Sequence, residues 1–448
     1  MTINKLAQQL AAGTITARSL VEDSLERIAD PAGEGSRAFL SVAADRARAT
    51  AEGFDAIRKA GGMVPPFAGI PFAVKDLCDV EGEVSSAGST VLADTPAAMV
   101  NAPALQRVIN AGFIPIGRTN MTEFAYSGLG LNSHFPEPAA PWDRAARRIP
   151  GGSSSGTGVA VADGMAVAGL GTDTGGSCRI PAAFCGIVGY KPTARRIPLD
   201  GIVPLSSSLD SVGPLAGSVA DCAVVDDLFA GGDGRWTIER RPPRHIRLAA
   251  ITDFVLDDVD DTVAATHTAA LSRLSAAGIE VVDVPFPELN TLGDINAKGG
   301  LPAAEAYHWH RSLLASRGDG YDQRVRVRIE PGADITAADY LDVVAARAAM
   351  IADARRRMDG FDAFVLPSVA IIPPTIDSFD GNPDPDYYGT VNRLCLRNTA
   401  VGNFLDSCSI SIPSSSPGEA PVGLMLMGAP MDDRRLFSVA QAVEATLR

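Results

Sequence analysis

Two serines with the same local sequence are the first candidates for chemistry. Ser153 and Ser177 each follow two glycines, and the segment between them is rich in Ala, Val and Gly. Two glycines before a serine remove side-chain obstruction and let backbone N–H groups point at a developing oxyanion. A serine attacks a carbonyl carbon only when a base takes its proton. The same pattern also suits serines in turns, so the interpretation depends on finding a base.

A lysine within an apolar run is the candidate base. Lys75 lies in Ile-Pro-Phe-Ala-Val-Lys-Asp, and Lys191 lies in Gly-Ile-Val-Gly-Tyr-Lys-Pro. A buried ammonium group is costly, so such a lysine tends to lose its proton and can then act as a general base. The alternative is a lysine that reaches the surface or forms an ion pair, and Asp76 is the adjacent partner of Lys75.

Three other chemistries fit the sequence less well. Residues 152–156 match the Gly-x-Ser-x-Gly elbow of α/β-hydrolases, but that elbow needs a later histidine, and no histidine follows His310. The glycine-rich stretches lack the spacings that bind nucleotide phosphates. His308 and His310 are too close in sequence to share one face of a helix as metal ligands. We therefore expect no metal and no cofactor.

Charge and hydropathy narrow the range of partners. The chain has 448 residues and a formal net charge of −14, which disfavours a nucleic-acid or anionic membrane partner. Six cysteines without a Cys-x-x-Cys pair are typical of reduced core thiols. The N-terminus lacks the pattern of a signal peptide, and no run of about 18 apolar residues suggests a transmembrane helix. These features predict a cytoplasmic protein.

The elements that must position the candidate residues follow from apolar periodicity. The run 67–76 predicts a buried strand that carries Lys75. Strands and helices alternate along the chain, which predicts an α/β fold. The other expected strands are 113–117, 247–251, 279–284, 362–366, 408–412 and 422–427. The expected helices are 3–29 with a break at Gly13, 41–60, 103–111, 262–277, 303–316, 337–358 and a C-terminal helix.

The block 150–192 contains GGSSSGTG and GTDTGGSCRIPAAFCGIVGYKPT, and the chain also contains PFAVKD, GFIPIGRTNMTEFAYSG and PVGLMLMG. Together these motifs resemble those of the amidase signature family, serine hydrolases with a Ser-cisSer-Lys triad. The resemblance implies one large domain over 1–448, with a central mixed sheet covered by helices on both faces. It also implies a signature core at about 67–195, with N-terminal helices at about 1–60 packed on it.

The resemblance also assigns catalytic roles. It implies that Ser177 is the nucleophile, that Ser153 is the bridging serine after a cis peptide, and that Lys75 is the base. The implied oxyanion hole consists of backbone N–H groups around Thr174, Gly175 and Gly176.

Substrate contacts are expected at three further residues. By the same resemblance, Tyr126 and Ser127 approach the acyl pocket, and Arg179 matches the arginine of the family's GGSxR motif. Arg179 has either a structural role or a substrate contact. The basic loop 144–148 suits either an anionic substrate or a solvated surface. The segment 403–408 departs from the family's Asn-x-x-Gly-x-Pro pattern next to the expected pocket.

The implied activity is hydrolysis of a linear carboxamide to a carboxylate and ammonia or an amine, through an acyl-enzyme. Two alternatives of the same family remain: a glutamine-dependent amidotransferase A-like subunit, and a urea- or biuret-type C–N hydrolase that works with a partner. A non-enzymatic binding module would not need the complete triad. The expected ligand is a small-molecule amide, and the resemblance leaves open a homodimer or a small accessory subunit.

Overall fold

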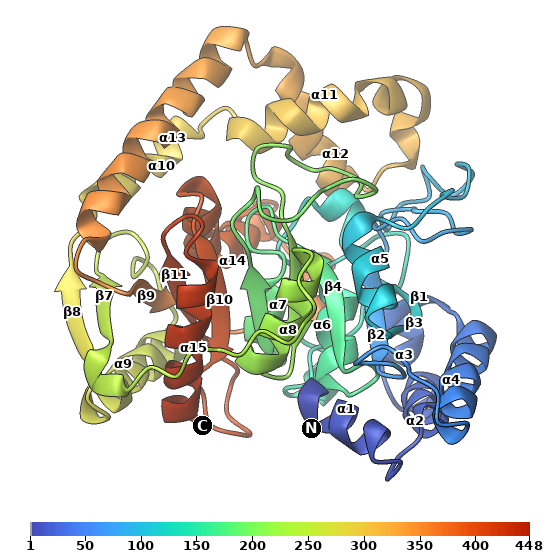
Figure 1. The fold of residues 1–448 in the computed structure, drawn as a ribbon. Helices are drawn as coiled ribbons and strands as arrows, with labels where there is room; N and C mark the ends of the chain where they lie inside the picture. The colour runs from blue at the N-terminus through green and yellow to red at the C-terminus, as the bar shows by residue number, and fades with distance from the viewer. Residues whose placement is uncertain (1) are drawn as a thin grey trace.

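One mixed β-sheet of eleven strands runs through the whole molecule (Figure 1). The structure is a computed structural model and describes residues 2–448. The strand order is β1-β3-β2-β4-β6-β5-β10-β11-β9-β7-β8. The strands are β1 (Phe39–Val42), β2 (Pro71–Lys75), β3 (Ile114–Thr119), β4 (Ala168–Thr172), β5 (Val188–Lys191), β6 (Val212–Ala216), β7 (Arg247–Ile251), β8 (Glu280–Val284), β9 (Ala363–Pro367), β10 (Cys408–Pro413) and β11 (Gly423–Gly428).

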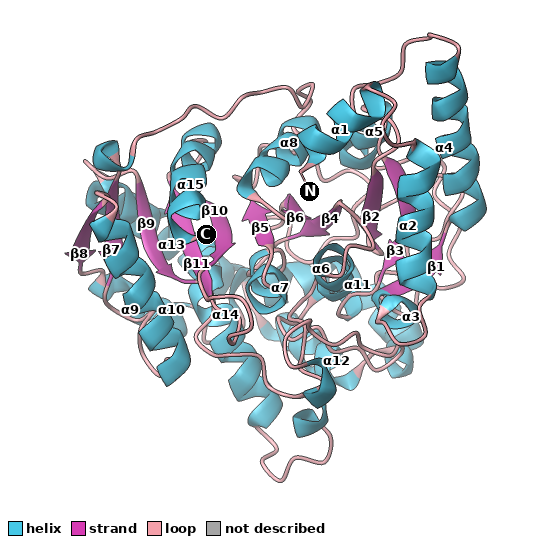
Figure 2. Cartoon of the chain, turned by 90° about the horizontal axis from the view of Figure 1, so that it is seen from below, coloured by secondary structure: helices cyan, strands magenta, loops and turns pink. Residues whose placement is uncertain are grey.

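Helices cover both faces of this sheet (Figure 2). One layer contains α1, α5, α8 and α15, and the opposite layer contains α6, α7 and α14. The helices are α1 (Ile3–Ala11), α2 (Ala17–Ala29), α3 (Gly35–Ala38), α4 (Ala44–Lys59), α5 (Pro103–Asn110), α6 (Ser155–Ala162), α7 (Arg179–Cys185), α8 (Val219–Phe229), α9 (Asp261–Ala276), α10 (Leu292–Ile295), α11 (Gly300–Arg317), α12 (Gln323–Ile329), α13 (Ala337–Met358), α14 (Tyr387–Phe404) and α15 (Asp433–Leu447). The predicted α/β class, with a mixed sheet between two helical layers, is confirmed.

Local sequence explains several of these elements. The predicted break at Gly13 separates α1 from α2, and Thr16 caps α2 with a reciprocal hydrogen-bond pair to Ser19. The expected strands 247–251 and 279–284 and the expected helix 262–277 form the unit β7-α9-β8, in which the two strands are parallel. In α15, Leu436, Val439 and their neighbours at helical spacing are buried against the sheet.

Apolar periodicity did not predict several of the strands and helices. Strands β4, β5 and β6 contain glycine or proline among few residues, and such sequences resemble turns. Helix α14 contains Gly389 and Gly402 together with Asn and Thr, which are weak helix formers. The short strand β1 precedes the predicted 41–60 helix, which begins at Ala44. Tertiary packing therefore decides these segments.

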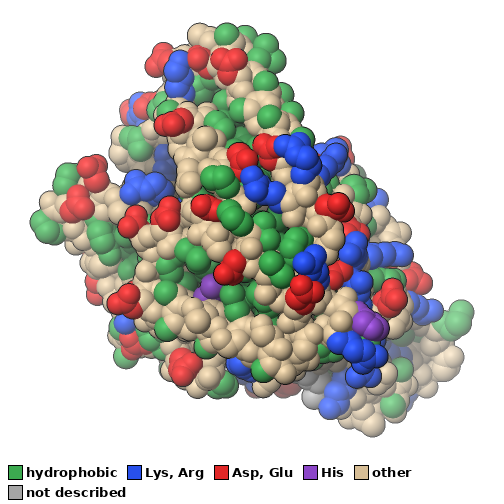
Figure 3. All heavy atoms as spheres, turned by 90° about the vertical axis from the view of Figure 1, so that its left-hand side faces the viewer, with side chains coloured by type: hydrophobic (Ala, Val, Ile, Leu, Met, Phe, Trp, Pro, Cys, Tyr) green, Lys and Arg blue, Asp and Glu red, His purple; other side chains and the backbone are tan. Residues whose placement is uncertain are grey.

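Three further helices lie over one end of the sheet, and the surface carries charges of both signs. Helices α11, α12 and α13 form an arch over one end of the sheet (Figure 1). On the face shown in Figure 3, acidic and basic side chains are interspersed. Within residues 2–448, no helix is both long enough and apolar enough to cross a bilayer.

Candidate active site

Lys75 ends the buried strand β2, which lies between β3 and β4 in the sheet. Its side chain is fully buried, and its Nζ lies 2.7 Å from Ser153 Oγ and 2.9 Å from Thr172 Oγ1. The neighbouring Asp76 instead accepts from Arg118 Nε at 2.7 Å. Among the described residues Lys75 forms no ion pair, so the ion-paired alternative does not apply to it.

Burial shapes the acid–base behaviour of this lysine. It lowers the pKa of Lys75 from 10.5 to about 7, although the charges of Asp173 and Asp210 oppose the shift. A lysine with a pKa near 7 is half neutral at neutral pH. The neutral amine can accept a proton from the Ser153 hydroxyl.

The two serines lie on adjacent turns at the starts of two packed helices. Ser153 precedes α6 and Ser177 precedes α7, and Ser154 N donates to Ser177 O at 3.3 Å. The Gly152–Ser153 peptide is cis. Lys75 and Ser153 are in direct contact, whereas no hydrogen bond within residues 2–448 joins the hydroxyl groups of Ser153 and Ser177. The structure thus brings the three residues to one region and leaves the second contact unmade.

Ser177 opens into a cavity of about 850 Å³. Tyr126, Ser127, Thr174 and Gly175 also line this cavity, and Lys75 and Ser153 lie buried behind it. In the part of the chain that the structure describes, the backbone N–H groups of residues 174–177 have no hydrogen-bond acceptor. A row of free N–H groups beside a serine is suited to binding an oxyanion.

Arg179 lies outside the cavity lining. It is fully buried, and its guanidinium pairs with Asp173 at 2.8 Å and donates to Thr399 O at 2.8 Å and Asn403 Oδ1 at 2.6 Å. Burial alone would raise the pKa of Asp173, but the Arg179 charge and its hydrogen bonds lower that pKa to about 2. This position matches the structural alternative for Arg179.

Comparison with known proteins agrees with this architecture. The family model described as Amidase matches residues 19–437. The chain belongs to the amidase family. It is 36% identical over 407 residues to 2-amino-5-chloromuconic acid deaminase of Comamonas testosteroni, covering 90% of this chain and 87% of the relative.

Two further similarities span nearly the whole amidase-family chain. It is 33% identical over 477 residues to the A subunit of Glutamyl-tRNA(Gln) amidotransferase from Synechococcus sp. (strain CC9605), covering 99% of this chain and 96% of that protein. A crystal structure of an amidase superposes with a TM-score of 0.90 at 31% identity, and each chain is covered completely. The implied membership of the amidase family is therefore confirmed.

The remaining predicted residues of this amidase-family site form its outer wall. Ser127 Oγ donates to Asn392 Oδ1 at 2.8 Å and accepts from Tyr388 at 3.0 Å. The carbonyl oxygen of Tyr126 accepts from Arg328 Nη1 at 2.8 Å. The backbone and hydroxyl groups of residues 126–127 thus connect the cavity wall to α12 and α14.

The polar residues that α12 and α14 add to the cavity were not predicted from the sequence. Arg328, Asn392, Arg393 and Arg397 all line it. Helix α14 was not expected, so its residues had no predicted position, and arginines on α12 resemble those of any solvated helix. The departing segment begins at Asn403, which lines the cavity and donates to Asp173 Oδ1 at 2.9 Å.

The other features singled out in the sequence lie away from this cavity. In the loop 144–148, Arg144 pairs with Asp163 and Arg148 pairs with Asp143. Lys191 donates to Pro192 O at 2.8 Å. His310 is buried on α11, 2.9 Å from the Tyr321 hydroxyl. All six cysteines are free and buried.

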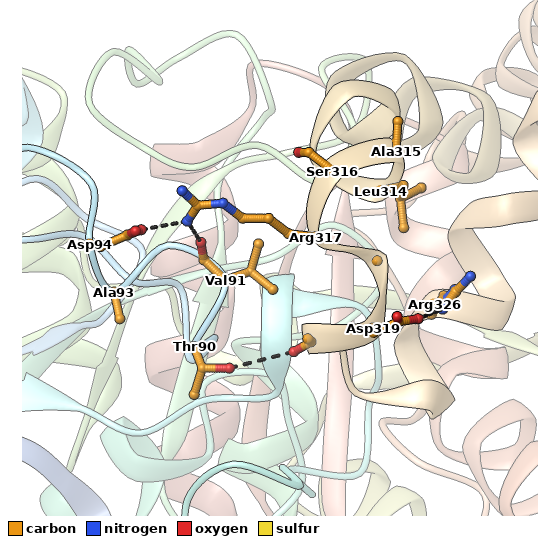
Figure 4. A pocket seen from close by; sticks show the side chains of 12 residues that line it. Thr90, Val91, Ala93, Asp94, Leu314, Ala315, Ser316, Arg317, Asp319 and Arg326 are labelled. Atoms are coloured by element: carbon orange, nitrogen blue, oxygen red, sulfur yellow. Dashed lines mark hydrogen bonds and ion pairs between the residues drawn. The ribbon is translucent and has the colours of Figure 1, made fainter.

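A second hollow lies between the loop 90–94 and the C-terminal end of α11 (Figure 4). Arg317 bridges it by donating to Val91 O and pairing with Asp94. None of the predicted catalytic or substrate residues lines it. The cavity beside Ser177 is therefore the candidate active site.

Proposed function

We propose that this protein is an amidase that cleaves a carboxamide through an acyl-enzyme on Ser177. The observation that carries the proposal is the contact between Lys75, whose pKa is about 7, and Ser153. The next residue, Ser154, donates a backbone hydrogen bond to Ser177, which opens into a cavity. This arrangement supplies a base without a histidine. Membership of the amidase family supports the same reaction class.

The first half of the reaction forms the acyl-enzyme. Neutral Lys75 accepts a proton from Ser153, and Ser153 accepts the proton of Ser177. The Ser177 oxygen bonds to the amide carbonyl carbon, and the carbonyl electron pair moves onto oxygen. Free N–H groups of residues 174–177 hold that oxyanion, and in other hydrolases each such donor is worth about 10²–10³ in rate.

The second half releases both products. When the oxyanion collapses, the carbon–nitrogen bond breaks, and the proton returns through Ser153 to the leaving nitrogen. Ammonia or an amine then departs. A water molecule gives a proton to the same base as its oxygen bonds to the ester carbon. The bond to Ser177 then breaks, the base returns that proton to the Ser177 oxygen, and the acid product leaves as a carboxylate after losing its proton to solvent.

The cavity favours a substrate that carries a carboxylate. Arg328, Arg393 and Arg397 line it, and none of them forms an ion pair within residues 2–448. Asp257 and Asp258 also line it, and their charges act on Arg397. Arg328 is half-buried and donates one hydrogen bond to Tyr126 O. Its guanidinium carbon lies 4.9 Å from the ring centre of Tyr388. Its guanidinium is thereby oriented, and guanidinium is the group best suited to a carboxylate. The relative from Comamonas testosteroni is likewise named for an acidic compound.

An ammonia-release assay tests this proposal. The panel contains neutral amides (acetamide, benzamide), monoamides of dicarboxylic acids, glutamine and biuret. We expect turnover of a carboxylated amide, and Arg328→Met should raise its KM by at least about tenfold, because one charged hydrogen bond is worth about 1.5–3 kcal/mol. Lys59→Met, which removes a surface cation on α4, is the matched control. Preference for neutral amides in both proteins would contradict the substrate class.

Glutamine in that panel addresses the second candidate function. The 33% identity to the A subunit of an amidotransferase, over 99% of the chain, favours glutamine hydrolysis for a partner protein. Release of ammonia from glutamine, and from no other compound of the panel, would support that candidate. The homodimer and the accessory subunit remain predictions, as do the urea- and biuret-type substrates.

A further inference from the structure

A buried carboxylate lies next to the proposed oxyanion segment without lining the cavity. Asp210 belongs to the connection that leads into β6, and its side chain is buried. One carboxylate oxygen accepts from the Thr174 hydroxyl. The other accepts from the backbone N–H groups of Leu205 at 2.9 Å and Ser206 at 3.0 Å. Three donors therefore hold one carboxylate behind the wall of the active site.

Sheet register puts Asp210 there. Strands β4 and β6 are antiparallel, with Thr172 opposite Val212. The ladder continues one step past the strand ends, because Asp173 and Ser211 exchange backbone hydrogen bonds of 2.8 and 3.1 Å. The next opposed pair is Thr174 and Asp210. The hydrogen bond between their side chains thus follows from the strand pairing.

We propose that Asp210 is a positioning residue for the amidase reaction: its carboxylate fixes Thr174 beside Ser177, two residues along the chain from Thr172, which contacts Lys75 Nζ at 2.9 Å. The proposal rests on the role of Lys75 as base in the proposed function. Asp210 touches neither substrate nor the reacting atoms, so it acts only through Thr174 and Lys75.

The charges around Lys75 single out Asp210. Three groups oppose the effect of burial on its pKa: Cys178, Asp173 and Asp210. Burial raises the pKa of the Cys178 thiol, which is therefore neutral. The Asp173 carboxylate is already neutralised by Arg179 at 2.8 Å. Asp210 has no cationic partner within 4.0 Å in the described chain, so its charge is the least compensated.

The surroundings of Asp210 keep it charged where Lys75 titrates. Burial raises its pKa to about 6, with a smaller contribution from Glu305, while the hydrogen bonds from Thr174, Leu205 and Ser206 oppose this rise. At pH 7 to 8 the carboxylate is thus mainly ionised. Removing its charge should lower the pKa of Lys75 and leave more neutral lysine at a given pH.

Glu305 of α11 holds the same connection from its outer side. Its carboxylate accepts from the hydroxyl groups of Ser206 at 2.6 Å and Tyr340 at 2.7 Å, and from Ser208 N at 3.0 Å. Weakening the hydrogen bonds of Glu305 loosens the segment before β6 that contains Asp210. It does not remove any of the charges that act on Lys75. Glu305→Gln is therefore a matched control for loosening alone.

The substitution Asp210→Asn removes the charge at constant shape. The carbonyl oxygen of the substituted side chain could accept from the two backbone N–H groups, and its amide could donate to Thr174 Oγ1, whose hydroxyl can rotate. The readout is the rate at which a fluorophosphonate probe labels Ser177 between pH 5.5 and 9, which needs no known substrate. Ser177→Ala sets the background.

We expect the midpoint of the acid limb to move down by about 0.5 pH unit in Asp210→Asn, less than the ~1 unit of a direct ion pair. Labelling at pH 7, where Asp210 is mainly ionised in the wild type, should rise about 1.5-fold as a fraction of the plateau. In Glu305→Gln the midpoint should stay within about 0.2 pH unit of that of the wild type. An unmoved or raised midpoint in Asp210→Asn overturns the proposal.

A second pair of variants applies if Asp210→Asn does not fold. Thr174→Val removes one donor from the Asp210 carboxylate and so favours its neutral form, whereas Thr174→Ser retains the hydroxyl. The midpoint should be lower in Thr174→Val than in Thr174→Ser, and equal midpoints overturn the role of Asp210. If the wild type is labelled at Ser177 but the Asp210 substitution does not change the pH midpoint, the proposed function stands without the role of Asp210. A wild type that takes up no probe overturns both.

Discussion

Replacement of Arg179 by methionine separates the structural role of this arginine from a substrate contact. The change leaves the Asp173 carboxylate fully buried, with only Asn403 Nδ2 and the Cys178 N–H as donors. Breaking a buried ion pair on one side costs about 3–5 kcal/mol, because an uncompensated charge remains. We expect a loss of that size in the free energy of unfolding at pH 7, measured by urea denaturation.

The pH dependence of that loss is a second, independent expectation. In the wild type the folded pKa of Asp173 is about 2, below its ordinary 3.8. The ionised carboxylate therefore stabilises the fold above pH 3.8 by about 2 kcal/mol, and this contribution disappears as the pH falls through 2. Without Arg179 the folded pKa should lie above the ordinary value, so protonation relieves the penalty. The difference between the two proteins should shrink from pH 7 to pH 4.

A surface ion pair provides the control. Lys298 pairs with Asp339 at 2.7 Å but is largely exposed, so Lys298→Met should cost less than about 1 kcal/mol. A loss below about 1 kcal/mol in Arg179→Met would refute the structural role. So would an Arg179→Met protein of normal stability in which only the KM for substrate rises.

Two other perturbations test the catalytic assignments. Only neutral Lys75 can act as base, and its pKa is about 7, so probe labelling at Ser177 should fall about tenfold from pH 8 to pH 6. Lys75→Ala should lose nearly all labelling at neutral pH. A Lys75→Ala protein that is labelled at the wild-type rate would exclude the base role. Gly176 has φ of +140°, and a Cβ there would collide with Thr399, whereas a Cβ at Gly175 meets only the end of the Leu396 side chain. Gly176→Ala should therefore reduce labelling about 10²-fold, the value of one oxyanion donor, and Gly175→Ala should reduce it far less; equal rates in the two variants would contradict the geometry proposed for this segment.

The candidate catalytic residues could be named from the sequence more readily than the elements around them. Lys75 could be singled out because a lysine in a continuous apolar strand has few structural explanations. The contact between Lys75 and Ser153 spans 78 residues and depends on the turn before α6, so no local pattern contains it.

Most residues around the cavity could not be assigned to it from the sequence. Helix α14 has weak helix formers and was not predicted, so Asn392 and its neighbours had no position. Asp210 lies opposite Thr174 only because β4 and β6 pair in one register, and both strands contain glycine. Non-local pairing decided these positions, and periodicity alone does not report it.

Mass spectrometry of the fluorophosphonate-treated protein shows directly whether Ser177 is the nucleophile. We expect one adduct per chain, located by peptide mapping at Ser177, and no adduct in Ser177→Ala. An adduct at Ser153 instead, or undiminished labelling of Ser177→Ala, would contradict this role of Ser177.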